Sequence, residues 1–525
     1  MTSEPGRLAV WNAWLASVAE EMGITLGLTA HSPNIRERRD YSCGVFDAEG
    51  RMVAQAAHIP VHLGAMPEAV RAVQALAPWQ PGDVAILNDP FLGGTHLPDV
   101  SLVAPVFFRG VLVGFVSNRA HHADIGGMSS GSMPVASELI QEGVVIPPLR
   151  LVNGGIFNNE LFALILRNTR TPDERRGDFE AQLAALRTGE QRLTGLCERY
   201  GLAVVRDMMD TLLRYTERLT RAAIEDIPDG EARAEDVLEG PAGELFPIRA
   251  RVRVSGSEVE VDFAGTSPEQ EVSLNAVAAV TRSAVGYCIR CLLPRGAPAN
   301  EGSAWPITIL LPEGSLVHAR SGRAVSAGNV ETSQRITDVV LAALRQLLPR
   351  TIPAASAGTM SNLTFGGRGP GGAPFAYYET IPGGAGAGPS RDGLSGVQTH
   401  MTNTANTPVE AIESGFPVRI RRFELREGSG GRGVHRGGDG VVKEVEFIVD
   451  ANFALIANRY ITAPQGVDGG EDALHGQAAI VSQDGTERNL PPLSHGRMHA
   501  GATLRIETPG GGGWGPPPSP PMSGP

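Results

Sequence analysis

NDPFLGGTHLPDVSLVAPVFFRGVLVGFVSNRAHHADIGG, residues 88–127, contains two apolar runs separated by Arg109 and Gly110. Apolar runs of this length joined by a short turn predict two antiparallel strands of a buried hairpin. If Arg109 and Gly110 are the two turn residues, Phe108 faces Val111. The hairpin then forms the centre of a sheet, and polar loops lie at its open end.

This register brings residues 96–99 and 121–124 together. Asp99 falls opposite Ala120, and His96 falls opposite Ala123. Two imidazoles with carboxylates form a mixed nitrogen and oxygen set that suits Zn²⁺, Mn²⁺ or Fe²⁺ with an open position. Singly, such residues usually cap turns, but their convergence favours a metal site. The possible ligands are His96, Asp99, His121, His122 and Asp124, with Asp89 as a sixth.

The rest of the chain predicts an α+β fold. Apolar residues at helical spacing predict helices at 8–24 and 67–76, and short strands are expected at 41–56 and 83–87. Residues 172–227 are charged and poor in glycine, which predicts an antiparallel helical hairpin. Period-two alternation predicts strands at 247–263, a helix follows at 274–292, and glycine-rich short strands begin near residue 355.

We therefore expect a large multi-layer fold with mixed sheets, a helical hairpin insertion and a glycine-rich, β-rich C-terminal half. The expected regions are 1–170 (α+β, with the metal site), 171–230 (helical hairpin), 231–350 (α+β), 351–516 (glycine-rich, β-rich) and 517–525 (disordered tail).

Composition excludes several classes of protein. The chain has 57 acidic and 45 basic residues, a formal charge of −12, which argues against nucleic-acid binding. A hydrophobic content of 42% with 19% charged residues excludes disorder for the bulk of the chain. No apolar run is long enough to span a bilayer, and the N-terminal stretch predicts an amphipathic helix rather than a signal peptide. A cytoplasmic protein without membrane partners and with four reduced cysteines is expected.

Other motifs carry weaker signals. His58 and His62 are four residues apart, but Pro60 between them disfavours a continuous helix. We therefore interpret both as structural histidines in a loop. A second interpretation is that they line a binding pocket. Cys288 and Cys291 form a lone C-x-x-C in an apolar stretch, which indicates core residues. The glycine-rich segments lack a P-loop lysine and the strand–helix context of a dinucleotide fingerprint, so they are loops.

Polar groups also occur later in the chain. Glu331 lies in NVETSQ, where a helix N-terminus favours it for structural reasons. Glu379 precedes PGGAGAG, and His400 lies in THMTNT. With Asp40 and His62, Glu379 and His400 are our candidates for substrate binding.

Seven segments together resemble one known family. The chain is similar, from about residue 8 to residue 516, to the hydantoinase B/oxoprolinase family. This family includes the B-type component of ATP-dependent N-methylhydantoinases, the C-terminal half of 5-oxoprolinase, and a component of acetone and acetophenone carboxylases. The matching segments are ERRDYSCGVFDAEGRMVAQAAHIPVHLGAM, GDVAILNDPFLGGTHLPDVSLVAPVF, NRAHHADIGGMSSGSMP, EGVVIPPLRLVNGG, NVETSQRITD, THMTNTANTPVE and TPGGGGWG.

The resemblance implies a two-component enzyme. A hydantoinase A-type subunit of the acetate-kinase and actin-like class uses ATP to phosphorylate a carbonyl or amide oxygen, and the B-type chain completes the reaction. Carried over by position, His96, Asp99 and His121 are the best metal ligands. The resemblance thus implies a hydrolase acting on carbon–nitrogen bonds of a small cyclic amide, in a hetero-oligomer with a homo-oligomeric core.

Our hypothesis for the reaction is attack by a metal-bound water on the phosphorylated ring. His122 or Asp124 is the expected general base, with Glu331 more distant. One alternative is a carboxylase component acting on an activated ketone, although such carboxylases commonly have larger chains and a third, zinc-binding subunit. Another is a non-catalytic scaffold for the A-type subunit, against which the cluster of polar loop residues argues.

Overall fold

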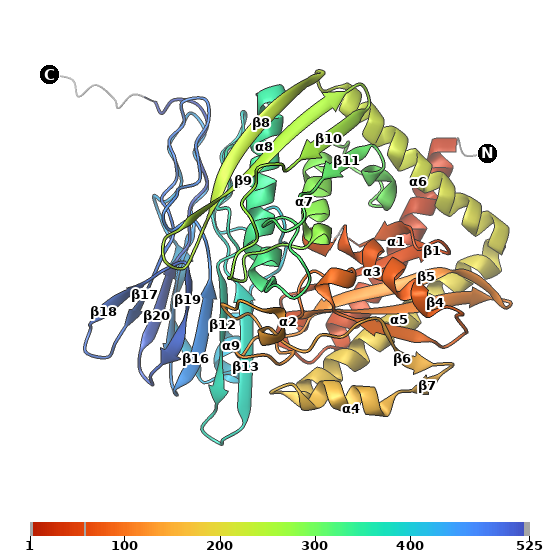
Figure 1. Cartoon of the computed structure of the whole chain (residues 1–525), viewed down its shortest axis with the longest axis horizontal. Coiled ribbons are helices and arrows are strands. Elements are labelled where there is room, and N and C mark those ends of the chain that lie inside the picture. The colour runs from red at the N-terminus through yellow and green to blue at the C-terminus, as the bar shows by residue number, and fades with distance from the viewer. Residues whose placement is uncertain (1–3, 57–58, 63, 519–525) are drawn as a thin grey trace.

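The computed structural model describes residues 4–56, 59–62 and 64–518, and Figure 1 shows the arrangement of its helices and sheets. The expected disordered tail lies almost wholly in residues 519–525, outside the described residues, as does His58. Four sheets form, of seven, four, four and five strands. The α+β fold class is confirmed.

The first sheet contains the predicted hairpin at its centre. Its strand order is β2-β1-β5-β4-β3-β6-β7, and all its pairs are antiparallel. Because β4 and β5 are covered on both faces, almost every side chain in them is buried. Its strands are β1 (Tyr41–Asp47), β2 (Met52–Gln55), β3 (Val84–Leu87), β4 (Asp99–Phe108), β5 (Val111–His121), β6 (Leu149–Asn153) and β7 (Ile156–Phe157).

Helices cover both faces of this sheet. Long helices α1 and α5 pack on each other, with α1 on β1 and α5 on β4 and β5, and the short helix α3 also contacts β4 and β5 (Figure 1). The helices before residue 230 are α1 (Glu4–Thr29), α2 (Pro33–Arg36), α3 (Ala65–Val73), α4 (Asn159–Arg167), α5 (Pro172–Tyr200) and α6 (Leu202–Glu225).

The predicted helical hairpin needs a correction. Both helices form, but α5 packs mainly along α1, whereas α6 packs mainly against the short 3-10 helix Glu301–Ala304 and less against α5. The charged pattern predicted two amphipathic helices correctly. It could not tell which neighbour each apolar face meets, because that depends on elements distant in sequence.

The middle of the chain forms a second sheet against two helices. Its order is β11-β10-β9-β8, and β10 and β11 are parallel, which makes this sheet mixed as predicted. α8 packs on β8, β9 and α7. The elements are β8 (Gly230–Glu239), β9 (Leu245–Ser255), β10 (Glu258–Asp262), α7 (Ala278–Arg290), β11 (Ile307–Leu310) and α8 (Ser333–Leu347).

The C-terminal region is a sandwich of the two remaining sheets. Side chains from both sheets share one apolar core, including Phe365 and Phe447. The sheet orders are β13-β12-β16-β19 and β14-β15-β20-β17-β18. The elements are β12 (Asn362–Arg368), β13 (Pro374–Thr380), α9 (Val409–Gly415), β14 (Val418–Leu425), β15 (Val441–Phe447), β16 (Ala451–Ile456), β17 (Gln477–Val481), β18 (Glu487–Leu490), β19 (Leu493–Met498) and β20 (Thr503–Glu507).

The glycine-rich segments are packed backbone to backbone, rather than forming open loops. The amide of Gly511 donates to the carbonyl of Gly438, and that of Gly438 donates to Ala385, each at 2.9 Å. A Cβ on Gly437 would lie 1.8 Å from the carbonyl oxygen of Gly511. Glycine is required here because neighbouring backbones approach too closely for any side chain.

Two further expectations concern single features. The four cysteines, all of which are described, form no disulfide. Within the described ranges, none of the helices combines the length and the apolar character needed to cross a bilayer.

Candidate metal centre

The β4–β5 hairpin differs from its predicted register by one residue at the functional end. Phe108 does face Val111, but a bulge between Val106 and Phe107 shifts the later pairs, so that Asp99 faces His121 instead of Ala120. Both strands are apolar on both faces, so alternation in the sequence gives no sign of the extra residue. Directly opposed residues share a face of the sheet, which places the two side chains side by side.

Asp99, His121 and His96 form a buried cluster. One nitrogen or oxygen atom from each lies within 4.8 Å of the others. His96 Nε2 is 3.3 Å from Asp99 Oδ2, and the exposed fraction of each residue is at most 2%. Two histidines and one carboxylate are donors that suit a divalent transition metal.

Hydrogen bonding orients the His96 ring toward Asp99. His96 Nδ1 lies 3.4 Å from the carbonyl oxygen of Ser326, which can only accept, so Nδ1 carries a proton. Nε2 faces both the carboxylate of Asp99, 3.3 Å away, and the amide nitrogen of Asn329, 3.2 Å away. A ring nitrogen facing a carboxylate at this distance is favourable only when a cation or a proton lies with them.

The other two residues also fit a cation. Asn34 Nδ2 lies 2.9 Å from His121 Nδ1, and the ring of Tyr378 stacks on the imidazole at 4.2 Å. Because an amide nitrogen donates, Nδ1 is the acceptor and the proton of the neutral ring is on Nε2, where a cation would take its place. Among the described residues, neither His121 Nε2 nor Asp99 Oδ1 has a hydrogen-bond partner, although both atoms are buried. Buried polar atoms are nearly always paired, so these two atoms mark the place where a bound ion would be held.

The charge states of two of the ligands follow from their surroundings. Burial opposes ionisation of Asp99, but His96 and His62 outweigh it and hold the pKa of Asp99 well below its usual value. Burial, assisted by His96, lowers the pKa of His121 well below its usual value. The centre therefore presents an ionised carboxylate, which is the form that binds cations, and an uncharged His121 at neutral pH.

Two of the residues predicted for substrate binding border this centre. His62 Nε2 lies 3.3 Å from Asp99 Oδ2, and its Nδ1 lies 2.7 Å from the Ser42 hydroxyl. The Asp40 carbonyl accepts the His121 amide at 3.0 Å. Burial raises the pKa of the Asp40 carboxyl to about 7, although Arg38 opposes the shift.

The predicted general bases next to His121 point elsewhere. His122 Nε2 lies 3.0 Å from the Gln182 side chain, and its ring packs on Phe179 of α5. Asp124 accepts from Arg170 at 2.7 Å. His122 follows the last residue of β5, and its ring lies against α5 rather than against the ligands. These contacts differ from the prediction that His122 or Asp124 serves the centre as its general base.

Two other candidates stabilise the fold locally. Asp89 accepts from the Phe91 amide at 2.9 Å and caps a short helical turn, so it does not join the cluster. Glu379 forms a buried ion pair with Lys443 and accepts from Tyr377 at 3.2 Å. These contacts of Glu379 lie within the C-terminal sandwich. Among the described residues, the metal-binding cluster consists of His96, Asp99 and His121 and includes neither Asp89 nor Glu379.

Glu331 lies one step behind the centre, in a π-helical turn over Gly328–Thr332. It accepts from Asn362 at 3.0 Å, and Asn362 in turn accepts from the hydroxyl of Tyr378 at 2.9 Å. Burial raises the pKa of Glu331 to about 8. Because Tyr378 stacks on His121, Asn362 and Tyr378 connect Glu331 to the centre.

His400 lines a surface hollow next to Tyr287, whose hydroxyl is 3.4 Å from His400 Nδ1. Asp338 lies 3.9 Å from the other ring nitrogen. The sequence analysis missed Asn34, Arg38 and Tyr378. Asn34 lies just before the ERRD motif and Arg38 lies within it, but nothing in the pattern shows that they reach His121.

The fold and the cluster define a large multi-layer α+β protein with a buried two-histidine, one-aspartate centre. The chain belongs to the hydantoinase B/oxoprolinase family, whose model matches residues 4–517.

Similar proteins differ in length and name. The chain is 39% identical to 5-oxoprolinase 1 of Arabidopsis thaliana over 97% of its own length but only 42% of that protein. It thus spans less than half of that longer relative. A protein of Pseudomonas sp. whose name makes it a candidate B-type component of a D-/L-hydantoinase is 32% identical, with 96% of this chain and 88% of that protein covered.

Solved structures give the same fold. The ATP-dependent caprolactamase from Pseudomonas jessenii superposes with a TM-score of 0.91 at 29% identity, covering 98% of this chain and 92% of that one. A nucleotide-free acetone carboxylase gives 0.89 at 19% identity, with 98% and 76% covered. The second likeness concerns the fold alone.

Proposed function

We propose that this chain opens the ring of a small cyclic amide after a partner A-type subunit has phosphorylated the amide oxygen with ATP. The buried cluster of His96, Asp99 and His121 carries the proposal. Its side chains are of the kinds that bind cations, and two of their buried atoms have no hydrogen-bond partner among the described residues. The chain also belongs to the hydantoinase B/oxoprolinase family. Relatives named 5-oxoprolinase and a caprolactamase structure support a cyclic amide as the substrate class.

The proposal of a partner rests on the names of similar proteins. The Pseudomonas sp. protein named as a candidate B-type component of a D-/L-hydantoinase is covered to 88% of its length, and a component of type B implies a second component. The caprolactamase structure is named as ATP-dependent, and residues 1–525 contain no P-loop motif. We therefore propose that the partner binds ATP.

In the proposed reaction, water adds to the ring carbon that bears the phosphorylated oxygen. The carbon–nitrogen bond then breaks, the ring nitrogen takes up both protons of that water, and an acyl phosphate forms. A second water hydrolyses the acyl phosphate to a carboxylate and free phosphate. A divalent cation, Mn²⁺, Zn²⁺ or Fe²⁺, held by the three clustered residues would supply Lewis acidity and lower the pKa of a coordinated water toward neutrality.

The chain's own residues prepare this site. His96 and His121 are held in orientation by Ser326 and Asn34. Asp40 borders the centre with a pKa of about 7, so it can exchange a proton near neutral pH. Burial keeps bulk water away from an activated intermediate.

The test combines metal content with turnover. Wild type and the His96→Ala/His121→Ala variant are purified without chelators, and their metal is measured by elemental mass spectrometry. Each is then mixed with an A-type subunit and ATP, and ring opening of hydantoin, 5-oxoproline and caprolactam is followed. We expect near-stoichiometric metal and ATP-dependent ring opening in wild type only.

The alternatives give different results. A carboxylase component would consume ATP only with a ketone and bicarbonate, and would open no ring. A scaffold would leave turnover unchanged in the double variant. Wild-type turnover by that variant would refute the proposed role of the centre.

A further inference from the structure

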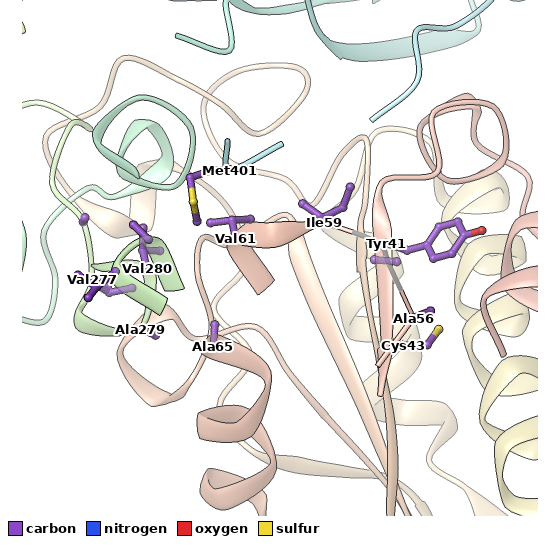
Figure 2. Close-up of a cluster of buried hydrophobic side chains, with 14 of the residues drawn as sticks. Tyr41, Cys43, Ala56, Ile59, Val61, Ala65, Val277, Ala279, Val280 and Met401 are labelled. Carbon is purple, nitrogen blue, oxygen red and sulfur yellow. The ribbon is translucent and has the colours of Figure 1, made fainter. Parts of the chain in front are cut away.

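Residues 399–407, here named the covering segment, lie against the outer side of the centre. The amide of Val61 donates to the Met401 carbonyl at 3.3 Å, and the amide of Ala405 donates to the Arg38 carbonyl at 2.9 Å. Figure 2 shows the buried Met401 side chain beside Val61, with Val280 nearby. An apolar anchor and backbone hydrogen bonds thus hold the segment in place.

Three hollows surround the covering segment. Their volumes are about 830, 620 and 550 Å³, and Asn403 is a wall of all three. The described residues that line these three hollows do not include His96, Asp99 or His121. The covering segment is thus a shared wall of three hollows that the ligands of the centre do not line.

Arg38 contacts the centre on its inner side. Its Nη1 donates to the side-chain oxygen of Asn34, whose amide nitrogen lies 2.9 Å from His121 Nδ1. The guanidinium also lies over the ring of Tyr378, 4.9 Å from its centroid, and donates to the Tyr378 carbonyl at 3.1 Å. Tyr378 stacks on His121, so Arg38 reaches His121 by two separate paths.

The outer side of Arg38 contacts the covering segment. Nη2 donates to the hydroxyl of Thr404 at 3.3 Å and to that of Thr380 at 2.9 Å. The two hydroxyls lie 2.8 Å apart. Arg38 itself is fully buried, so its planar guanidinium has no solvent alternative to these partners.

We propose that Arg38 is a positioning residue that couples the covering segment to the metal-binding cluster. Loosening the segment at Thr404 then loosens the hold on a cation, although Thr404 touches none of the three ligands. The proposal rests on the proposed function for the identity of the centre. It adds a link by which opening the segment to substrate changes the geometry of His121.

The test uses the full chain loaded with Zn²⁺. A chelator extracts the metal, and the release rate is compared between wild type, Thr404→Val and Thr404→Ser. Valine keeps the shape but removes the hydroxyl that contacts Arg38, Thr380 and Thr402. Loss of the hydrogen bond to Arg38 is expected to make release about fivefold faster. Serine keeps the hydroxyl and should restore the wild-type rate. Asn403→Ala, an exposed neighbour, is the matched control and should leave the rate unchanged.

Coupling is then checked with Arg38→Met. Release from the Arg38→Met/Thr404→Val protein should be no faster than from Arg38→Met alone, since the link is already broken. Thr380→Val removes the second hydroxyl on Nη2 and replaces Thr404→Val if that variant fails to fold. Equal release from wild type and Thr404→Val, or fully additive effects, would overturn the coupling.

A second measurement does not need metal. The Cε1 NMR signal of His121, assigned with His121→Gln, should shift in Thr404→Val and return in Thr404→Ser. If wild type binds no Zn²⁺, the metal assignment of the proposed function fails, and the His121 signal alone decides the coupling. An unchanged signal in Thr404→Val overturns it.

Discussion

Replacing Asn34 with alanine is expected to weaken cation binding at the centre by about fivefold. The Asn34 amide nitrogen donates to the His121 carbonyl at 2.6 Å and so fixes the backbone of this ligand. A hydrogen bond of this kind contributes about 1 kcal/mol, or about fivefold at 25 °C. The same nitrogen lies 2.9 Å from Nδ1, but that contact favours a ring proton on Nε2 and adds nothing to cation binding.

The assay is competition for Zn²⁺ between the protein and a chromogenic chelator. Asn118→Ala is the matched control, because Asn118 is also buried and makes two hydrogen bonds, but to Gln182 on α5. A Zn²⁺ affinity of Asn34→Ala within twofold of wild type would refute the claim that Asn34 orients His121. An equal loss in both variants would show that general destabilisation is the cause.

Three further predictions concern the surrounding fold. Glu331 is a carboxyl whose pKa is raised from 4.5 to about 8 by burial, so the folded state retains a proton that the unfolded state loses. Stability should therefore fall as pH rises from 4.5 to about 8, and Glu331→Gln should be more stable than wild type at pH 8 by a few kcal/mol, but not at pH 4, in urea unfolding. Gly511→Ala should lower the melting temperature by several degrees because its Cβ would lie 2.1 Å from the Ala385 carbonyl, whereas Gly371→Ala, with open space around it, should not. Lys443 is the one lysine in the sequence and is 1% exposed in its ion pair with Glu379, so acetic anhydride should acetylate it only after unfolding, as read by peptide mass spectrometry.

Much of the first sheet followed from the sequence. The apolar runs around Arg109 and Gly110 predicted the β4–β5 hairpin, and the polar residues at its open end predicted the cluster of His96, Asp99 and His121. These inferences held because hairpin partners are local in sequence. The bulge could not be predicted because the strands are largely apolar on both faces. The predicted register was therefore wrong by one residue, but His96, Asp99 and His121 still lie together at the end of the hairpin.

The residues behind the cluster could not be predicted in the same way. Arg38 contacts Thr404, 366 positions away, and Asn329 contacts His96, 233 positions away. No periodicity in a single sequence reports contacts between distant elements. The sequence predicts loops for the glycine-rich segments for the same reason, since the close approach of their backbones depends on the three-dimensional fold.

One face of the β4–β5 hairpin carries buried polar side chains, and their cost indicates that the centre is retained for function rather than for stability. Asp99, Ser101, Arg119 and His121 lie on that face, in strands that are otherwise largely apolar. Burial raises the free energy of each polar group unless it is fully paired. Arg119 Nη1, like Asp99 Oδ1, has no partner among the described residues, and burial lowers the pKa of Arg119 to about 10. An apolar face would give a more stable sheet, so selection for chemistry at this position is the simplest physical account of these side chains.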